Sequence, residues 1–166
     1  MSLIKASYTV HRSKCYAGQV ADTSLYNVDG TTVGDMELPI GRIVAVKAVQ
    51  AIEGHKVITL ARDNSLPLLG VVIESHSYAP EGVYEEGCAT NVMTHGRVWV
   101  PMIKSSFNEA DVAYDKPVSA NNDGIVEHGG SVKTGYKFTG EWHPSDNADY
   151  NLVKIQVLQS VAVPAP

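Results

Sequence analysis

The sequence has few cysteines, no long apolar run and no basic run. Its only two cysteines, Cys15 and Cys88, lie far apart and form no CxxC pair, which favours two small buried or half-buried thiols over a disulfide or a metal pair. No apolar stretch approaches the ~20 residues needed to cross a bilayer. Residues 1–7 lack the apolar core and cleavage site of a signal peptide. We therefore expect a protein that is made in a cytoplasm and has no membrane partner.

Positive charge is scarce and scattered along the chain. The 13 lysines and arginines form no cluster, and the formal net charge is −5. Nucleic-acid binding depends on clustered basic residues that neutralise phosphates, so we expect no nucleic-acid partner. With 166 residues, 44% of them hydrophobic and 19% charged, the chain has the size and composition of one ordinary folded domain.

Recognisable catalytic and cofactor motifs are missing as well. There is no GxSxG, GxxxxGK[ST] or GxGxxG, and the six histidines occur at no ligand spacing such as HxH or HxxxH. The adjacent carboxylates Glu85 and Glu86 would point to opposite faces of a strand, so they would not act together on one substrate. The sequence predicts a protein that is not an enzyme and has no cofactor and no metal site. A loosely bound cation in the loop Asp146 to Asp149 is a weaker alternative.

The clearest secondary-structure pattern is a strand from Arg97 to Ile103, preceded by a predicted turn at His95-Gly96. Apolar and other side chains alternate along this strand, with Val98, Val100 and Met102 on one face and Arg97, Trp99 and Pro101 on the other. The region around it, from Tyr84, and a weaker copy from Tyr114 that includes Asp123-Gly124, are both typical of hairpins. Two such hairpins in tandem indicate the body of a β-domain.

Further strand patterns occur at Ile43 to Val49, Lys56 to Ala61, Leu68 to Glu74, Gly135 to Phe138 and Leu152 to Leu158. The first two predict a hairpin, the last two are expected to pair, and Gly70 predicts a bulge or a close backbone approach. Ser106 to Glu109 fits the capping box of a helix of one or two turns. The pattern predicts a mostly β fold, a single small barrel or a sandwich, with few or no helices.

The residue pattern divides the chain into three parts. Residues 1–38 are irregular and rich in turn residues, apart from a possible short strand at Tyr8 to Val10, and we expect an extended N-terminal arm there. Residues 39–160 form the β-barrel-like body, and residues 161–166 a flexible tail with two prolines. The arm could lie on a neighbouring protein or wrap around its own barrel.

Two tryptophans have more than one possible role. Trp142 and His143 fall in a polar connection, Thr139 to Tyr150, where Trp142 could contact a partner, fold back over the barrel mouth or stack on a sugar. Trp99, beside Arg97, is expected to pack in a second layer or at a subunit interface, because it lies on the nominal outer face of its strand.

The order of these features resembles a family of tailed-phage head proteins, the structural cement or capsid decoration proteins with a β-tulip body. The resemblance rests on Gly96-Arg97-Val98-Trp99-Val100 above all, and on a set of further segments: Tyr16 to Asp22, Leu38 to Arg42, Leu69 to Val72, His76 to Tyr78, Tyr84 to Gly87 and Asp123-Gly124. It covers residues 15–158.

The resemblance implies a structural function without catalytic residues. It implies a homotrimer on the capsid exterior of the virion that binds the major capsid protein of an HK97-like shell, clamps adjacent capsomers and is made in the host bacterial cytoplasm. The candidate partner-binding residues are Tyr8, Tyr16, Tyr26, Arg97, Trp99, Trp142 and His143. A tail, baseplate or fibre-attachment module is the alternative, and a carbohydrate-binding module is the third possibility.

Overall fold

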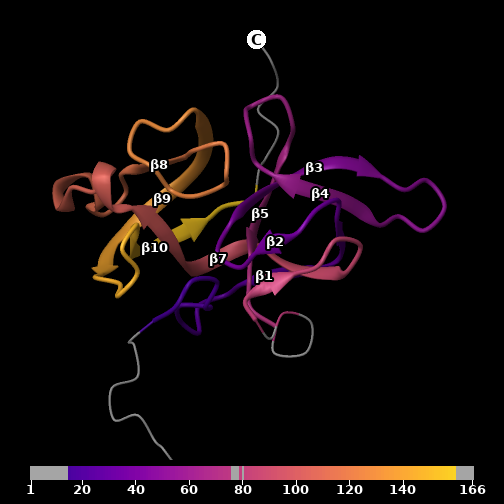
Figure 1. The fold of residues 1–166 in the computed structure, drawn as a ribbon, viewed down its shortest axis with the longest axis horizontal. Helices are drawn as coiled ribbons and strands as arrows, with labels where there is room; N and C mark the ends of the chain where they lie inside the picture. Colours follow the sequence, from indigo (N-terminus) through magenta and orange to yellow (C-terminus); the bar gives the residue numbers. More distant parts are fainter. Residues whose placement is uncertain (1–14, 76–78, 80, 160–166) are drawn as a thin grey trace, which may run out of the picture.

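A computed structural model describes residues 15–75, 79 and 81–159 of the chain (Figure 1). The predicted mostly β fold is confirmed. The strands are β1 (Asn27–Gly34), β2 (Leu38–Pro39), β3 (Ile43–Val49), β4 (Lys56–Leu60), β5 (Leu68–Val72), β6 (Val83–Tyr84), β7 (Ala89–Ile103), β8 (Pro117–Ala120), β9 (Val132–His143) and β10 (Tyr150–Val157). Two short 3₁₀ turns, η1 (Lys104–Ser106) and η2 (Glu109–Val112), follow β7.

A small closed barrel forms the first half of the fold. The eight-stranded sheet runs β1-β4-β3-β5-β7-β10-β9-β8, and an additional pairing of β1 with β7 closes β1, β4, β3, β5 and β7 on themselves. Closure removes the open sheet edges that these strands would otherwise expose. Beyond the barrel, the second half of β7 pairs with β10 over the register Tyr150↔Ile103 to Val157↔Gly96. The long strand β7 is therefore shared by the barrel and by the sheet that β10, β9 and β8 complete.

The predicted turn at His95-Gly96 is wrong, because both residues lie inside β7. Gly96 has a φ of 126°, a backbone conformation that glycine adopts without steric cost. A Cβ at this position would lie 2.5 Å from the Cβ of Tyr26. The glycine therefore bends the strand at the point where it leaves the barrel instead of ending it, and the hairpin that we predicted from this turn does not exist.

Two hydrophobic cores lie on opposite faces of the shared strands. Met93 of β7 belongs to the larger core and its neighbour Val92 to the smaller one, and Val71 and Val72 of β5 divide in the same way. All four side chains are fully buried. Alternation along a strand places successive side chains on opposite faces, so β5 and β7 act as the wall between the two cores.

The strands predicted at Ile43 to Val49, Lys56 to Ala61 and Leu68 to Glu74 are present as β3, β4 and β5, of which β4 ends one residue and β5 two residues earlier than predicted. β3 pairs with β4 as the expected hairpin. Both predictions for Gly70 hold: the register between β3 and β5 shifts beside it, and a Cβ there would lie 1.9 Å from the carbonyl oxygen of Met93. In the same way β10 pairs with β9 through Ile155↔Phe138.

Strand β1 contradicts the expectation of loop structure around Asp29 and Gly30. Asp29 Oδ1 accepts hydrogen bonds from both the backbone N–H and the hydroxyl of Thr31, and the register with β7 shifts between Asp29 and Thr32. The residues that indicate a turn therefore make a bulge within a strand. Residues 27–34, inside the range predicted as an arm, belong to the barrel. The predicted strand at Tyr8 to Val10 lies outside the described residues.

The second predicted hairpin also differs from the structure. Ile125 and Val126 follow the Asp123-Gly124 turn as expected, but Val126 makes only isolated bridges to Met102 and Ala120. The short helix begins after Asn108, whose side chain accepts a hydrogen bond from the N–H of Ala110, instead of at the predicted capping box. An asparagine satisfies a free N–H at a helix start as well as serine does, which explains the shift.

Candidate functional site

The chain before β1 is held against the outer side of β7. The N–H of Gly18 donates to the carbonyl of Trp99 over 2.8 Å, and the N–H of Ala21 donates to the carbonyl of Arg97 over 2.9 Å. Val20 forms a bridge with Val98. Residues 15–22, called here the docked segment, therefore extend the sheet by a short irregular strand.

Trp99 lies beneath the docked segment. It is 6% exposed and packs with Cys15 and Leu152 in a third hydrophobic cluster, separate from the two main cores. The ring of His143 lies 5.4 Å from it, centroid to centroid. Trp99 was predicted to pack either in a second layer or at a subunit interface. In the structure it packs in a second layer, which the docked segment forms over the sheet.

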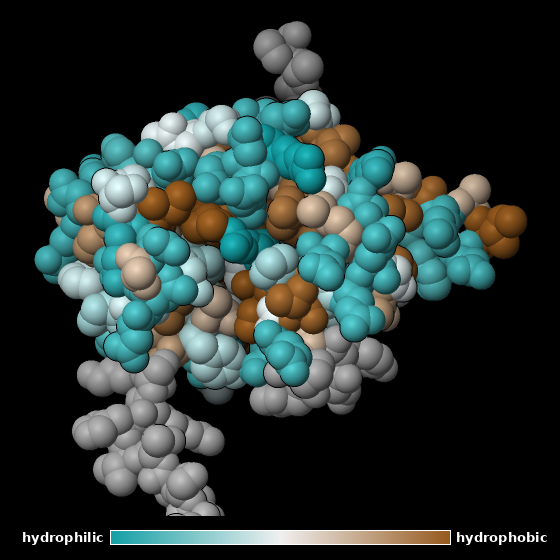
Figure 2. Space-filling view, in the orientation of Figure 1, coloured by the Kyte–Doolittle hydropathy of each residue, from teal (hydrophilic) through white to brown (hydrophobic). Residues whose placement is uncertain are grey.

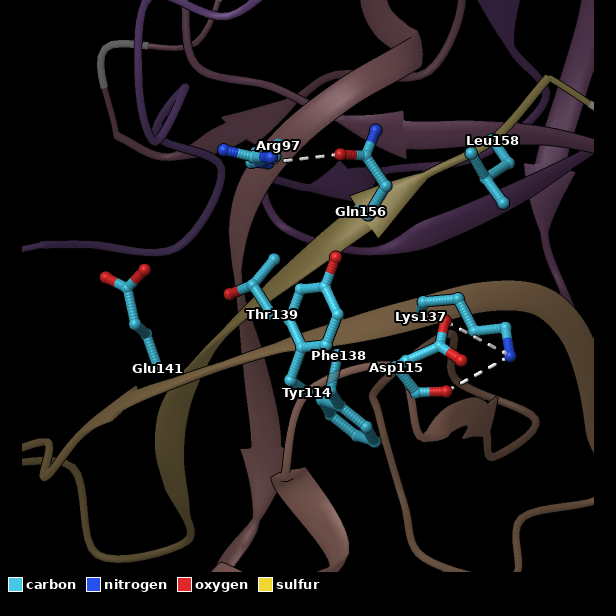
Figure 3. A pocket seen from close by; sticks show the side chains of 9 residues that line it. All are labelled: Arg97, Tyr114, Asp115, Lys137, Phe138, Thr139, Glu141, Gln156 and Leu158. Carbon is cyan, nitrogen blue, oxygen red and sulfur yellow. Dashed lines mark hydrogen bonds and ion pairs between the residues drawn. The ribbon is translucent and has the colours of Figure 1, made fainter.

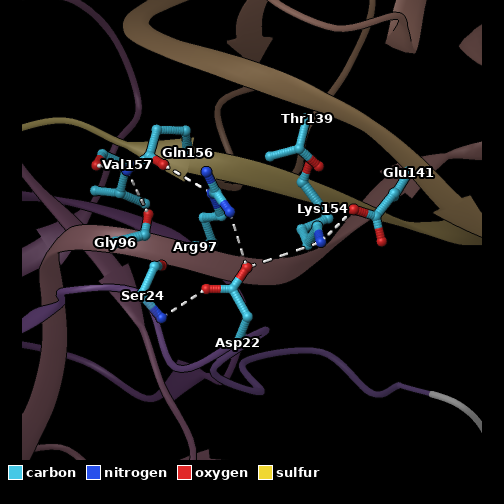
Figure 4. A network of polar contacts seen from close by, with 9 residues as sticks. All are labelled: Asp22, Ser24, Gly96, Arg97, Thr139, Glu141, Lys154, Gln156 and Val157. Atoms are coloured by element: carbon cyan, nitrogen blue, oxygen red, sulfur yellow. Dashed lines mark hydrogen bonds and ion pairs between the residues drawn. The ribbon is translucent and has the colours of Figure 1, made fainter.

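A polar network fastens the other end of the docked segment (Figure 4). The carboxylate of Asp22 lies 3.2 Å from the guanidinium of Arg97 and 3.9 Å from the ammonium of Lys154. Glu141 also pairs with Lys154, which is largely buried. Lys154 lies 5.9 Å from the centre of the Trp99 ring. The network joins β7, β9, β10 and the docked segment, so each charge has a partner of opposite sign.

This network makes the docking of the segment sensitive to acid. Hydrogen bonds from Ser24, and then from Arg97, lower the pKa of Asp22 from 3.8 to about 2. Because the folded-state pKa lies below the unfolded value, the stabilisation is complete above pH ~5 and is lost as the pH falls through about 2. Asp22→Asn should remove up to about 2 kcal/mol of stability at pH 7 and flatten the fall in melting temperature between pH 5 and pH 2. An unchanged melting temperature–pH profile would contradict this role of Asp22.

Trp142 and His143 belong to β9, which continues to His143 where the sequence predicts a polar connection. Trp142 pairs with Val153 in register and stacks on Phe107 at 4.7 Å between ring centroids. It is half-buried against the larger core. Trp142 therefore packs against the body, while the predicted contact with a partner stays a prediction.

The remaining predicted partner-binding residues are more accessible. Tyr16, within the docked segment, is 40% exposed, and Tyr26, directly before β1, is 46% exposed. Arg97 is partly exposed but paired with Asp22. Tyr8 lies outside the described residues. The structure thus brings Arg97, Trp99 and His143 together and leaves Trp142 apart from them.

Four strongly exposed apolar residues are not among the predicted partner-binding residues: Leu25, Val49, Ile52 and Tyr114. Ile52 is 98% exposed at the end of the β3–β4 hairpin, which projects from the body, and Figure 2 shows hydrophobic atoms at that end. A β-branched residue in a turn between two strands, where polar residues are usual, is a signal that could have identified it. Exposed aliphatic and aromatic residues of this kind mark contact surfaces when they cluster on a projecting element.

The structure offers no metal site among the described residues, where no three His, Cys, Asp or Glu side chains gather. In the loop considered for a cation, the ammonium of Lys104 donates to the carbonyls of Ser145, at 3.0 Å, and Asn147, at 2.6 Å. A lysine therefore takes the position in which a cation would bind. Cys15 and Cys88 are not joined by a disulfide, and no helix in the described part of the chain is long and apolar enough to span a membrane.

Comparisons with known proteins agree with this geometry. A chain in a solved structure, "The capsid of Myoviridae Phage XM1", has a similar fold, with a TM-score of 0.60 and 18% sequence identity over 95% of this chain and 99% of that chain. No curated protein matches the sequence. The family model of the structural cement protein (E217 gp24/Pam3 gp6) matches residues 4–158. The chain therefore belongs to the phage structural cement protein family, and its role is that of a cement or decoration protein of the virion capsid.

Proposed function

We propose that this protein binds the outside of an HK97-like head as a homotrimer, clamps adjacent capsomers together, and acts without catalysis. The observation that carries the proposal is the family match over residues 4–158. The exposed apolar residues outside the cores give the body further surfaces for contact. In this proposal the protein is made in the host bacterial cytoplasm and binds the assembled shell.

Multivalency explains how such a clamp holds without a tight single site. When three subunits each contact the shell, the second and third contacts form at a high effective concentration, so modest interfaces add to a slow overall release. Binding to the assembled shell and not to its free subunits stabilises the shell by mass action. The body fits this task because its closed barrel is a rigid platform for the loops and segments that make contact.

The N-terminal arm is the segment that we assign to the shell. The docked segment, which directly follows the arm in sequence, is held against β7 and has the exposed side chain of Tyr16. Tyrosine contributes a large contact area at low entropic cost and is enriched in interfaces. In the proposal, Tyr8, Tyr16 and Tyr26 contribute to this contact.

Removal of residues 1–14 should therefore weaken attachment to heads and leave the body folded. We expect at least tenfold lower affinity for heads that lack the protein, measured as the bound fraction after sedimentation over a range of protein concentrations. The melting temperature should change little, because the shortened chain keeps residues 15–22, in which the N–H groups of Gly18 and Ala21 donate to β7.

A matched control separates attachment from folding. Removal of residues 161–166, the predicted tail, shortens the chain at its other end and should leave the bound fraction unchanged. Equal binding of the full-length and arm-deleted chains would refute the assignment of the arm to the shell, while both failing to bind would refute the proposed function.

A further inference from the structure

One end of the barrel carries a groove that four of its strands surround. β1 and β4 run parallel to each other, and β3 is antiparallel to both β4 and β5. β1, β4 and β5 therefore begin at the same end, where the antiparallel strand β7 leaves the barrel. Residues of these four strands line a groove of about 480 Å³, called here the barrel-end groove. This volume lies within the usual range of ligand pockets, about 300–1,000 Å³.

Three partly exposed apolar side chains line the barrel-end groove. Val28 of β1 is 40% exposed, and Leu68 and Leu69 of β5 are half-buried. Leu68 packs against the larger core and Leu69 against the smaller one. Both cores therefore extend to the surface in this groove, and a segment that covers it would remove apolar area from water.

The charged groups of the groove are already paired with each other. The ammonium of Lys56 lies 2.8 Å from one carboxylate oxygen of Asp29. The other oxygen of this carboxylate accepts two hydrogen bonds from Thr31, and the hydroxyl of Thr94 donates to the carbonyl of Asn27. These groups need no partner from an occupant, so an uncharged apolar segment suits the groove better than a charged one.

The chain itself delivers such a segment to the groove. The pairing of β10 with β7 ends at Val157↔Gly96, and Gln159, two residues further on, lines the groove. Residues 160–166 follow with the sequence SVAVPAP, which has no charged side chain. They span at most about 25 Å when fully extended, so they stay within reach of the groove. The two prolines have no N–H group, so fewer donors need partners when this segment leaves water.

A second recess also adjoins the end of β10, but it suits this segment less well. It lies beside Tyr114, has a volume of about 370 Å³ and is lined in part by Leu158 (Figure 3). Its lining includes four charged side chains: Arg97, Asp115, Lys137 and Glu141. An apolar segment in this recess would take water away from these ions, which costs free energy. The lining of the barrel-end groove has only the pair of Asp29 and Lys56.

We propose that residues 160–166 lie in the barrel-end groove of their own chain, where Val161 and Val163 contact its apolar side chains. Side chains two positions apart share a face of an extended segment, so both valines can meet this lining together. Because the segment is tethered beside the groove, its effective concentration there is high, and a modest contact is sufficient to hold it. The contact closes this end of the barrel. It forms within one chain and is independent of the proposed function.

Disulfide trapping in solution tests this contact. Val163→Cys is combined with Val28→Cys in one full-length chain and with Tyr114→Cys in another, and both chains also carry Cys88→Ser. Each is oxidised at low protein concentration, and intact mass and thiol labelling after denaturation measure the link. We expect a link within one chain to Val28→Cys, at an initial rate at least tenfold above that of the link to Tyr114→Cys. Val28 and Tyr114 are both exposed, so both variants should fold.

A charge in the segment should weaken the contact. Val161→Asp, added to the chain with Val28→Cys and Val163→Cys, should lower the initial rate of the link at least fivefold, because the new carboxylate would leave water without a free cation to pair with. Val161→Thr has a similar shape and no charge, and it should lower the rate less.

Three results would overturn the inference. These are equal rates for the two cysteine pairs, a faster link to Tyr114→Cys, and a link between two chains in place of one within a chain. Binding to heads is measured separately, on the full-length and arm-deleted chains. The tail contact and the proposed function can therefore fail independently of each other.

Discussion

Replacement of Gly70 with alanine is expected to lower the free energy of unfolding by about 3 kcal/mol or more, a large part of the stability of an ordinary domain. The new Cβ would lie 1.9 Å from the carbonyl oxygen of Met93, a backbone atom that cannot rotate away. β5 and β7 would have to separate to make room for it. Their separation would break the pairs Val71↔Met93 and Val72↔Val92, which join the two strands. The barrel would open at this seam, and thermal or urea unfolding measures the loss.

Gly30→Ala is the matched control for this effect. Gly30 is exposed in β1, and a Cβ there would meet only the side-chain oxygen of Asn91, at an ordinary 3.5 Å. Its stability should change by less than about 1 kcal/mol. Similar unfolding curves for the two variants would mean that close approach at Gly70 does not govern barrel closure.

Trp99→Ala should cost about 3 kcal/mol and release the docked segment from the body. The substitution removes the largest side chain of the cluster that Cys15 and Leu152 complete, and the cavity would lie between the segment and the sheet. Hydrogen exchange of the amides of Gly18 and Ala21, which donate to β7, would report the release directly. We expect these two amides to exchange at least tenfold faster than in the unmodified protein.

Trp142→Ala separates this local effect from the general loss of an aromatic side chain. Trp142 is half-buried and its ring packs at a tilt against Phe107, in a different hydrophobic cluster from Trp99. Trp142→Ala should lower the overall stability by less than Trp99→Ala does. The amides of Gly18 and Ala21 should then exchange faster only by the factor that this smaller loss of overall stability explains. Faster exchange in both variants alike would argue against a specific role of Trp99 beneath the segment.

The sequence predicted the strands with uninterrupted β patterns because their side chains alternate between core and exterior. Val98, Val100 and Met102 are fully buried as their spacing requires. Gly70 was correctly assigned to a close approach because a glycine within an apolar run has few other reasons to be there. Local sequence was sufficient to predict these strands, because the alternation of apolar and polar residues within each strand determines its conformation.

Prediction failed where a turn residue serves a different purpose in three dimensions. Gly96 bends β7 between barrel and sheet, and Asp29 forms a bulge in β1, yet in the sequence both are indistinguishable from residues that end a strand. The pairing of β1 with β7, which closes the barrel, joins residues ~60 positions apart. Such long-range partners cannot be read from a single sequence without knowledge of the fold.

The candidate contact residues stay a prediction, and the structure shows only how exposed each of the described ones is. Aromatic residues drew attention to Trp99 and Trp142, which are buried and half-buried, while the fully exposed Ile52 was overlooked inside an ordinary hairpin. Exposure depends on what the rest of the chain covers, and the docked segment that covers Trp99 has no pattern of its own. The family resemblance through Gly96 to Val100, in contrast, is confirmed by the match over residues 4–158.

Quantitative mass spectrometry of gradient-purified particles tests the central claim most directly. A cement protein that covers the head should be present in a copy number near that of the major capsid protein. A few copies per particle would contradict this account and move the protein to the tail, baseplate or a fibre. Its absence from purified particles would contradict a structural role in the virion altogether.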